Sequence, residues 1–162
     1  MERNVFVGLG GNVGDSIAHV RDAIREIGKI ATTRVMTCSG LYRTTPVGKL
    51  DQGDFINAVA QLETALTPDA LMTRLLALES RHGRVRAEKN GPRTLDLDLL
   101  LYGDRILQLA HATVPHPRMH ERAFVLLPLA EIAPDCSIPG QGAVAALLSA
   151  LPEQGVIRID VA

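Results

Sequence analysis

Tryptophan is absent from this chain of 162 residues, which has only three phenylalanines, two tyrosines and two cysteines. Cys38 and Cys136 lie far apart and match neither a CxxC pair nor the spacing of zinc ligands. The sequence therefore disfavours a small domain held together by disulfides or zinc, and we expect two reduced thiols.

Long apolar runs and a strong net charge are also missing. The most apolar stretch, "AFVLLPLAEIA", is too short to cross a membrane and contains Pro128 and Glu131. The N-terminus does not resemble a signal peptide. A formal net charge of -1 gives no general attraction for nucleic acid or an acidic membrane surface. We expect a cytoplasmic, monomeric protein.

Hydrophobic residues make up 46% of the chain, enough for the core of one domain covering residues 1–162. Residues 4–10, 32–43 and 54–63 have strand-like composition or alternation. Apolar spacing predicts a helix over 15–28, with an Asp15 cap and a stop at Gly28. A second helix is predicted over 67–83, with a Thr67 cap and Pro68 in its first turn.

A leucine-rich strand within "GPRTLDLDLLLYG" (91–103) completes the order β-α-β-β-α-β, which is that of a ferredoxin-like α+β fold with a mostly antiparallel sheet. We expect both helices on one face, with C-terminal extensions beyond this core. Strand alternation then places one set of side chains towards the helices: Ile56, Ala58, Ala60, Leu62, Leu95, Leu97, Leu99 and Leu101. Phe55, Asn57, Asp96 and Asp98 are expected on the opposite, uncovered face.

Asp96 and Asp98 are the strongest sign of chemistry. Two positions along a strand separate their Cα atoms by roughly 6.5 to 7 Å, close enough to share one or two cations. The preceding loop (81–93) contains Arg81, Arg84, Arg86, Lys89 and Arg93. Guanidinium groups suit phosphate oxygens, and carboxylates suit Mg²⁺, so together they suggest a nucleoside triphosphate. The alternative is a solvated basic loop whose arginines form surface salt bridges with the aspartates.

Other polar clusters are less specific. "HATVPHPRMHERAF" (111–124) brings His111, His116, His120, Arg118 and Arg122 close in sequence, but it lacks the glutamate of an HExxH zinc motif. "GLGGNVGD" (8–15) matches neither GxGxxG nor a P-loop, so its glycines are expected to let the first strand turn tightly into its helix. Phe55, Phe124 and Asn57 would suit a flat heterocycle by stacking and hydrogen bonding.

These segments, together with "YRTTPVGKLDQGDFINAV" (42–59), resemble the 6-hydroxymethyl-7,8-dihydropterin pyrophosphokinase family of folate biosynthesis. The resemblance implies transfer of pyrophosphate from ATP to the pterin's hydroxymethyl group with two Mg²⁺ ions, releasing AMP. Asp96 and Asp98 would bind the metal, and Arg84 and Arg93 would steady the phosphates. The expected pterin contacts are Thr44, Pro46, Val47, Phe55, Asn57 and Phe124; the expected ATP contacts are Glu79, Arg84, Arg86, Arg93, His116, Arg118 and Arg122.

The chain departs from the family's usual pattern at three places. Asn90 stands where a tryptophan is usual, His111 stands where an arginine is usual, and "GGN" replaces Gly-Ser-Asn. The first two raise the question of whether a lid over 83–93 closes in the usual way.

A module that binds RNA without catalysis is the rival interpretation, because RNA recognition motifs share this element order and present aromatics on the open sheet face. The chain lacks their characteristic basic-Gly-aromatic stretch, and carboxylates on that face would repel a nucleic-acid backbone. We therefore favour the kinase interpretation and expect no nucleic-acid partner.

Overall fold

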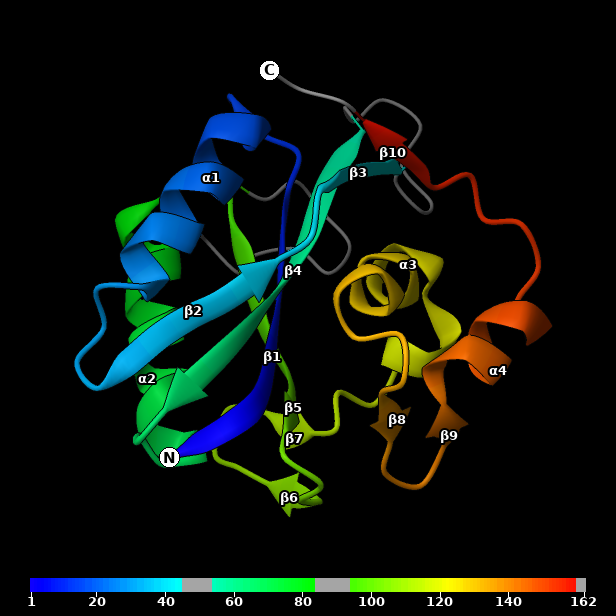
Figure 1. Ribbon diagram of the computed structural model, residues 1–162. Helices are drawn as coiled ribbons and strands as arrows, with labels where there is room; N and C mark the ends of the chain where they lie inside the picture. The colour runs from blue at the N-terminus through cyan, green and yellow to red at the C-terminus, as the bar shows by residue number, and fades with distance from the viewer. Residues whose placement is uncertain (45–53, 84–93, 160–162) are drawn as a thin grey trace.

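The computed structural model describes residues 1–44, 54–83 and 94–159. Its core keeps the predicted order except for one additional strand (Figure 1), with the elements β1 (Glu2–Gly11), α1 (Ser16–Ile27), β2 (Thr33–Cys38), β3 (Leu41–Thr44), β4 (Phe55–Thr64), α2 (Pro68–Arg81) and β5 (Asp96–Tyr102). The C-terminal extension adds β6 (Leu107–Gln108), β7 (Thr113–Val114), η1 (Met119–Glu121), α3 (Ala123–Ile132), β8 (Ser137–Ile138), β9 (Gly142–Ala143), α4 (Val144–Ala150) and β10 (Ile157–Ile159).

The main sheet is antiparallel and confirms the ferredoxin-like prediction. β1 lies in the centre between β5 and β4; β2 and β3 both pair with β4, and β10 extends the sheet from β3. Both predicted caps are present. The Asp15 carboxylate accepts a hydrogen bond from the Ala18 N–H at 3.1 Å, and the Thr67 hydroxyl accepts one from the Ala70 N–H at 3.2 Å.

The single strand predicted over residues 32–43 is wrong, because the structure divides it into β2 and β3. The break falls at Ser39 and Gly40, between β2 and β3, although the Ser39 N–H still donates to the Val59 carbonyl of β4 at 2.9 Å. The Ser39 hydroxyl accepts a hydrogen bond from the Val59 N–H at 2.9 Å, and the Gly40 N–H donates to the Glu131 carboxylate at 3.1 Å. These side-chain contacts replace ladder bonds and redirect the chain towards α3.

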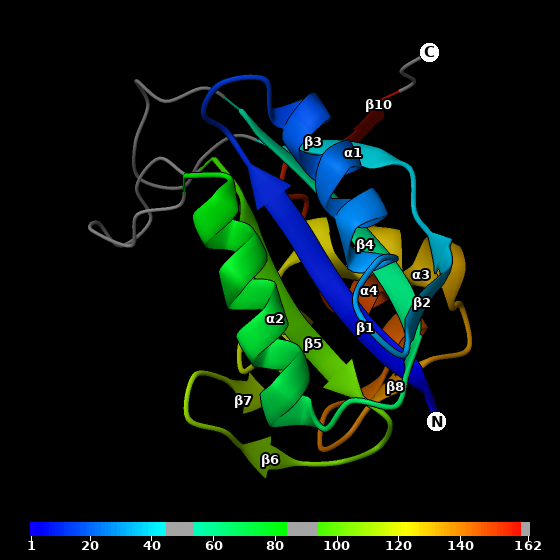
Figure 2. The same ribbon diagram turned by 90° about the vertical axis from the view of Figure 1, so that its left-hand side faces the viewer.

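Helices α1 and α2 cover one face of the sheet, as Figure 2 shows, and the main core lies between them and the strands. Leu95, Leu97 and Leu99 belong to this core, as predicted. Leu101 does not: Val7 pairs with Leu99 but Phe6 pairs with Leu101, so Leu100 is an extra residue in β5. This β-bulge reverses the alternation and places Leu101 in the core on the opposite face.

The face opposite α1 and α2 is not uncovered, which corrects the second part of the sidedness prediction. α3 lies against it, with α4 packed on α3 (Figure 1), and Val125, Leu126 and Leu129 pack with Phe6 and Val59 from the sheet in a second core. An apolar helix can bury several side chains in this way, at roughly 1.5 to 3 kcal/mol for each large one. The covered region lies in the middle of the sheet, and Asp96 and Asp98 remain half-exposed.

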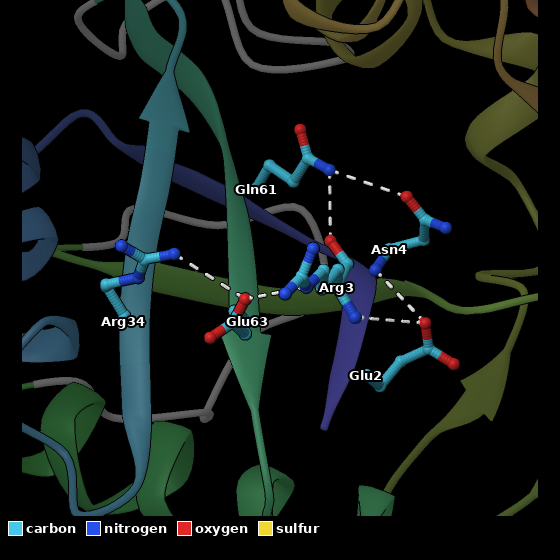
Figure 3. Close-up of polar contacts among 6 residues, drawn as sticks. All are labelled: Glu2, Arg3, Asn4, Arg34, Gln61 and Glu63. Carbon is cyan, nitrogen blue, oxygen red and sulfur yellow. Dashed lines mark hydrogen bonds and ion pairs between the residues drawn. The ribbon is translucent and has the colours of Figure 1, made fainter.

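The end of this face remote from Asp96 is polar and internally paired (Figure 3). Glu63 of β4 forms ion pairs with Arg3 of β1 at 3.0 Å and with Arg34 of β2 at 3.5 Å. The Gln61 side chain donates to the Arg3 carbonyl at 3.0 Å. Each pair joins an exposed guanidinium to the largely buried Glu63 carboxylate, and we assign them a structural role.

Candidate functional site

Phe55 and Asn57 lie near the start of β4, next to Thr44 at the end of β3. Thr44 pairs with Phe55, and Asn57 pairs with Tyr42 in the same ladder. Asn57 is only 7% exposed, yet within the described residues its Nδ2 has no hydrogen-bond acceptor. A buried amide donor without an acceptor is costly, so its retention here points to a ligand-binding role.

β1 brings this group opposite the acidic pair. Gly10 pairs with Asn57 on one side and with Asp96 on the other; Gly8 pairs with Val59 and Asp98. Adjacent strands are about 4.8 Å apart, so the backbones at Asn57 and Asp96 are separated by about 10 Å. Between them β1 presents glycines, which carry no side chain. The structure thus places the predicted heterocycle-binding amide and the predicted metal ligands on the two strands that flank β1.

Glu79 is buried, with 1% of its surface exposed, near the C-terminal end of α2. Its carboxylate accepts a hydrogen bond from the Leu97 N–H at 2.7 Å. Leu97 separates Asp96 from Asp98, so Glu79 fixes the backbone that carries both aspartates. The family resemblance implies an ATP contact for Glu79, which stays a prediction; its hydrogen bond to β5 is a finding of the structure.

His116 lies between β7 and η1, where its backbone N–H donates a hydrogen bond to the Leu100 carbonyl at 3.0 Å. Burial, supported by the positive charges of Arg122 and Arg118, lowers the pKa of His116 to about 4, although Asp96 acts in the opposite direction. The charges of Arg122, Asp96 and Arg118 thus act on His116, and the contact of His116 with ATP stays a prediction. A neutral imidazole at physiological pH serves as a hydrogen-bonding group and is a poor base.

Of the other histidines in this stretch, His120 lies near the same Glu121 carboxylate as Arg118, whose guanidinium is 3.5 Å from it. His111 is exposed in the turn between β6 and β7, and His120 lies 3.8 Å from the Glu121 carboxylate. Phe124 stands in the first turn of α3 and is half-buried against the second core. The Arg122 guanidinium lies 5.5 Å from the centre of the Phe124 ring, a cation–π distance that joins the basic segment to this aromatic side chain.

Several predicted site residues lie outside the described residues: Pro46, Val47, Arg84, Arg86, Lys89, Asn90 and Arg93. The expected lid over 83–93 is therefore also untested from Arg84 onwards. Arg81 is described, and its exposed guanidinium lies 3.9 Å from the Glu26 carboxylate, on α1.

The donor chemistry of β5 fits a hard divalent cation. Across residues 1–44, 54–83 and 94–159, no three or more His, Cys, Asp or Glu side chains gather into a metal cage. Two carboxylates with the remaining positions left to phosphate and water are the pattern that Mg²⁺ prefers in nucleotide-using enzymes. Asp96 and Asp98 match that pattern as half-exposed carboxylates on alternate positions of one strand.

Glu131, on α3, ties this helix to β3 and was missed from sequence. Besides the Gly40 N–H, its carboxylate accepts a hydrogen bond from the Tyr42 hydroxyl at 2.7 Å and lies 3.7 Å from the Arg158 guanidinium. Phe124 and Thr44 are thus on elements joined through one carboxylate. The only sequence signal was an isolated acid in an otherwise apolar helix.

Tyr42 should titrate late. Burial, followed by the hydrogen bond to Glu131, raises the pKa of Tyr42 to about 12 from its ordinary 10. Between these values the unfolded chain loses a proton that the folded chain keeps, so stability should fall as pH rises from about 10 to 12. Ultraviolet titration should show a late tyrosinate step that disappears in Tyr42→Phe and moves towards lower pH in Glu131→Gln. If the late step persists in Tyr42→Phe and is absent in Tyr102→Phe, it belongs to Tyr102 and the prediction for Tyr42 is wrong.

Among the described residues, no helix is both long enough and apolar enough to cross a bilayer.

Solved structures with a similar fold support the fold assignment. A crystal structure of HPPK-DHPS in complex with substrates aligns with a TM-score of 0.71 over 92% of this chain and 43% of that chain, at 12% identity. A Plasmodium falciparum HPPK-DHPS triple mutant gives a TM-score of 0.72, also at 12% identity and with 92% and 43% of the two chains covered. The chain thus spans less than half of these longer proteins, and at this identity the likeness concerns the fold.

Sequence comparisons identify the family. Residues 6–134 match the model of 7,8-dihydro-6-hydroxymethylpterin-pyrophosphokinase (HPPK). The 2-amino-4-hydroxy-6-hydroxymethyldihydropteridine pyrophosphokinase of Synechocystis sp. is 50% identical, over 84% of this chain and 69% of the relative. The enzyme of the same name from Pseudomonas aeruginosa is 42% identical over 98% of both chains, and that from Haemophilus influenzae is 38% identical over 96% and 97%. The chain belongs to the HPPK family.

Proposed function

We propose that this chain transfers pyrophosphate from ATP to the hydroxymethyl group of 6-hydroxymethyl-7,8-dihydropterin, a step of folate biosynthesis. As a member of the HPPK family, it is an ATP-dependent pyrophosphokinase. The observation that supports the proposal most directly is the pairing of Gly10 with Asn57 on one side and Asp96 on the other. That arrangement supports the proposal because the amide that we assign to the pterin and the carboxylates that we assign to Mg²⁺ flank the same residue of β1.

Asp96 and Asp98 would hold two Mg²⁺ ions together with the ATP phosphates. When bound, the ions neutralise charge that develops on the phosphate oxygens and help to align the reacting groups. The Glu79 hydrogen bond to the Leu97 N–H keeps the two carboxylates in a fixed relation to each other. Arg84 and Arg93 are proposed to contact the transferring phosphates.

The remaining residues divide between the two substrates. For the pterin, Phe55 and Phe124 would stack on the ring, and Asn57, Thr44 and the segment at Pro46 and Val47 would bind its edge. The groups proposed for ATP are Glu79, Arg84, Arg86, Arg93, His116, Arg118 and Arg122. Because His116 has a lowered pKa, it would contribute hydrogen bonds to ATP as a neutral ring.

The reaction needs no nucleophilic side chain. The hydroxymethyl oxygen of the pterin attacks the β-phosphorus of ATP, the bond between that phosphorus and the oxygen bridging to the α-phosphate breaks, and AMP leaves with this oxygen. The hydroxyl proton passes to solvent. The protein's part is to orient the two substrates and to surround the phosphates with positive charge.

Formation of AMP is the decisive measurement. The protein should release AMP from ATP only when both 6-hydroxymethyl-7,8-dihydropterin and Mg²⁺ are present, and EDTA should abolish the reaction until Mg²⁺ is restored. Release of ADP in place of AMP, or AMP formation that is indifferent to the pterin, would contradict the proposal.

We also propose a cytoplasmic monomer that does not bind nucleic acid, since the chain has a net charge of -1 and acidic groups on the relevant sheet face. Sedimentation at several protein concentrations tests the monomer. Salt-sensitive retention of single-stranded RNA on a filter would instead favour the RNA-binding alternative.

A further inference from the structure

Gly10 occupies the only position of β1 that pairs with both Asn57 and Asp96. Its backbone does not require glycine, because its φ lies outside the left-handed region in which side chains are rarely found. A β-strand normally gains from a larger residue, since glycine weakens strands. The reason for glycine here must therefore lie in what surrounds it.

The space above Gly10 is filled by the side chain of Asn57. A Cβ on Gly10 would lie 2.7 Å from Asn57 Oδ1 and 3.8 Å from its Cγ; the nearest backbone atom, the Ile56 carbonyl oxygen, is 3.5 Å away. Only the first distance, from the Cβ to Asn57 Oδ1, is shorter than a van der Waals contact allows. An alanine would therefore fit the strand but would push the amide of Asn57 aside.

Gly8 provides the contrast, since it is on the same strand and the same face, two residues earlier. Its Cβ would meet the Leu100 side chain at 3.5 to 3.6 Å, which is ordinary van der Waals contact. Alanine at Gly8 should be accommodated without moving a polar group.

The displaced group matters because the Asn57 amide is buried and its Nδ2 has no acceptor among the described residues. We propose that Gly10 is a positioning residue for the pterin. By carrying no side chain, it lets the Asn57 amide lie across β1 with its Nδ2 available to an acceptor on the edge of the heterocycle. This inference rests on the proposed function of Asn57 in pterin binding.

Gly10→Ala should weaken pterin binding by about tenfold or more, the loss of one hydrogen bond to a fixed partner. Affinity for a non-hydrolysable ATP analogue and the melting temperature should stay close to the parent values. Gly8→Ala, the matched control, should change none of the three. Equal weakening of both ligands, or unchanged pterin affinity in Gly10→Ala, would overturn the proposal.

A double-mutant cycle tests whether Gly10 acts through Asn57. Gly10→Ala should add no further loss of pterin affinity when Asn57 is already alanine, because the amide that it displaces is gone. A second full loss in the double variant would mean that Gly10 contacts the ligand or holds the strand directly, and would refute a positioning role.

An NMR spectrum without ligand separates this inference from the proposed function. The side-chain amide signals of Asn57 should shift in Gly10→Ala and stay in place in Gly8→Ala, whatever the protein binds. Unmoved signals in Gly10→Ala refute the inference alone, while the proposed function stands. If the signals shift in Gly10→Ala but the parent protein does not bind pterin, the proposed function is refuted. The assignment of Gly10 to pterin binding is then refuted as well.

Discussion

Asp96→Asn and Asp98→Asn should each lower kcat by about 10²- to 10⁴-fold, corresponding to the several kcal/mol that metal-mediated charge neutralisation contributes. An amide keeps the shape of the carboxylate and loses the charge that a hard cation requires. Both residues are half-exposed on β5, so the fold should persist. The measurement is the rate of AMP formation at saturating substrates, alongside circular dichroism.

Asp104→Asn is the matched control, since this aspartate is exposed in the turn that follows β5. It makes the same chemical change beyond the other end of β5, away from the proposed site, and its turnover should equal that of the parent. Near-parental turnover in both Asp96→Asn and Asp98→Asn would reject the metal assignment.

Glu79→Ala should lower the free energy of unfolding by about 2 to 4 kcal/mol, because the Leu97 N–H loses its buried acceptor and a cavity replaces the side chain. Activity should fall as well, since the backbone between Asp96 and Asp98 is no longer held. Glu79→Gln keeps an acceptor of the same size and should recover most of the stability. Urea denaturation of both variants gives the comparison.

The control for this helix is Ser80→Ala, the neighbouring and exposed residue of α2. It should change the unfolding free energy by less than about 0.5 kcal/mol, as surface substitutions usually do. If Glu79→Ala were as mild as Ser80→Ala, the hydrogen bond to Leu97 could not be what fixes the acidic strand.

Local patterns predicted well those features that depend on neighbouring residues. The caps at Asp15 and Thr67, the apolar stripes of both helices and the alternation of Leu95, Leu97 and Leu99 need only the period of a helix or a strand. The same alternation correctly separated Ile56 and Ala58 from Asn57.

Predictions failed where distant segments altered the local pattern. The break at Ser39 and Gly40 depends on Glu131, more than ninety residues away. The position of Leu101 depends on a bulge set by pairing with β1, and the covering of the second face depends on α3. An almost uniformly apolar helix such as α3 gives no indication of which face it will bury.

The sequence by itself determined most of the order of the elements, the family, and the position of a basic segment directly before an acidic strand, because periodicity and motif chemistry are properties of contiguous residues. Only the tertiary structure decided that Glu79 holds the backbone between the two aspartates, that Glu131 joins α3 to β3, and that Gly10 must leave room for the Asn57 amide. Those facts are distances between atoms of different strands and helices, and such distances exist only once the chain has folded.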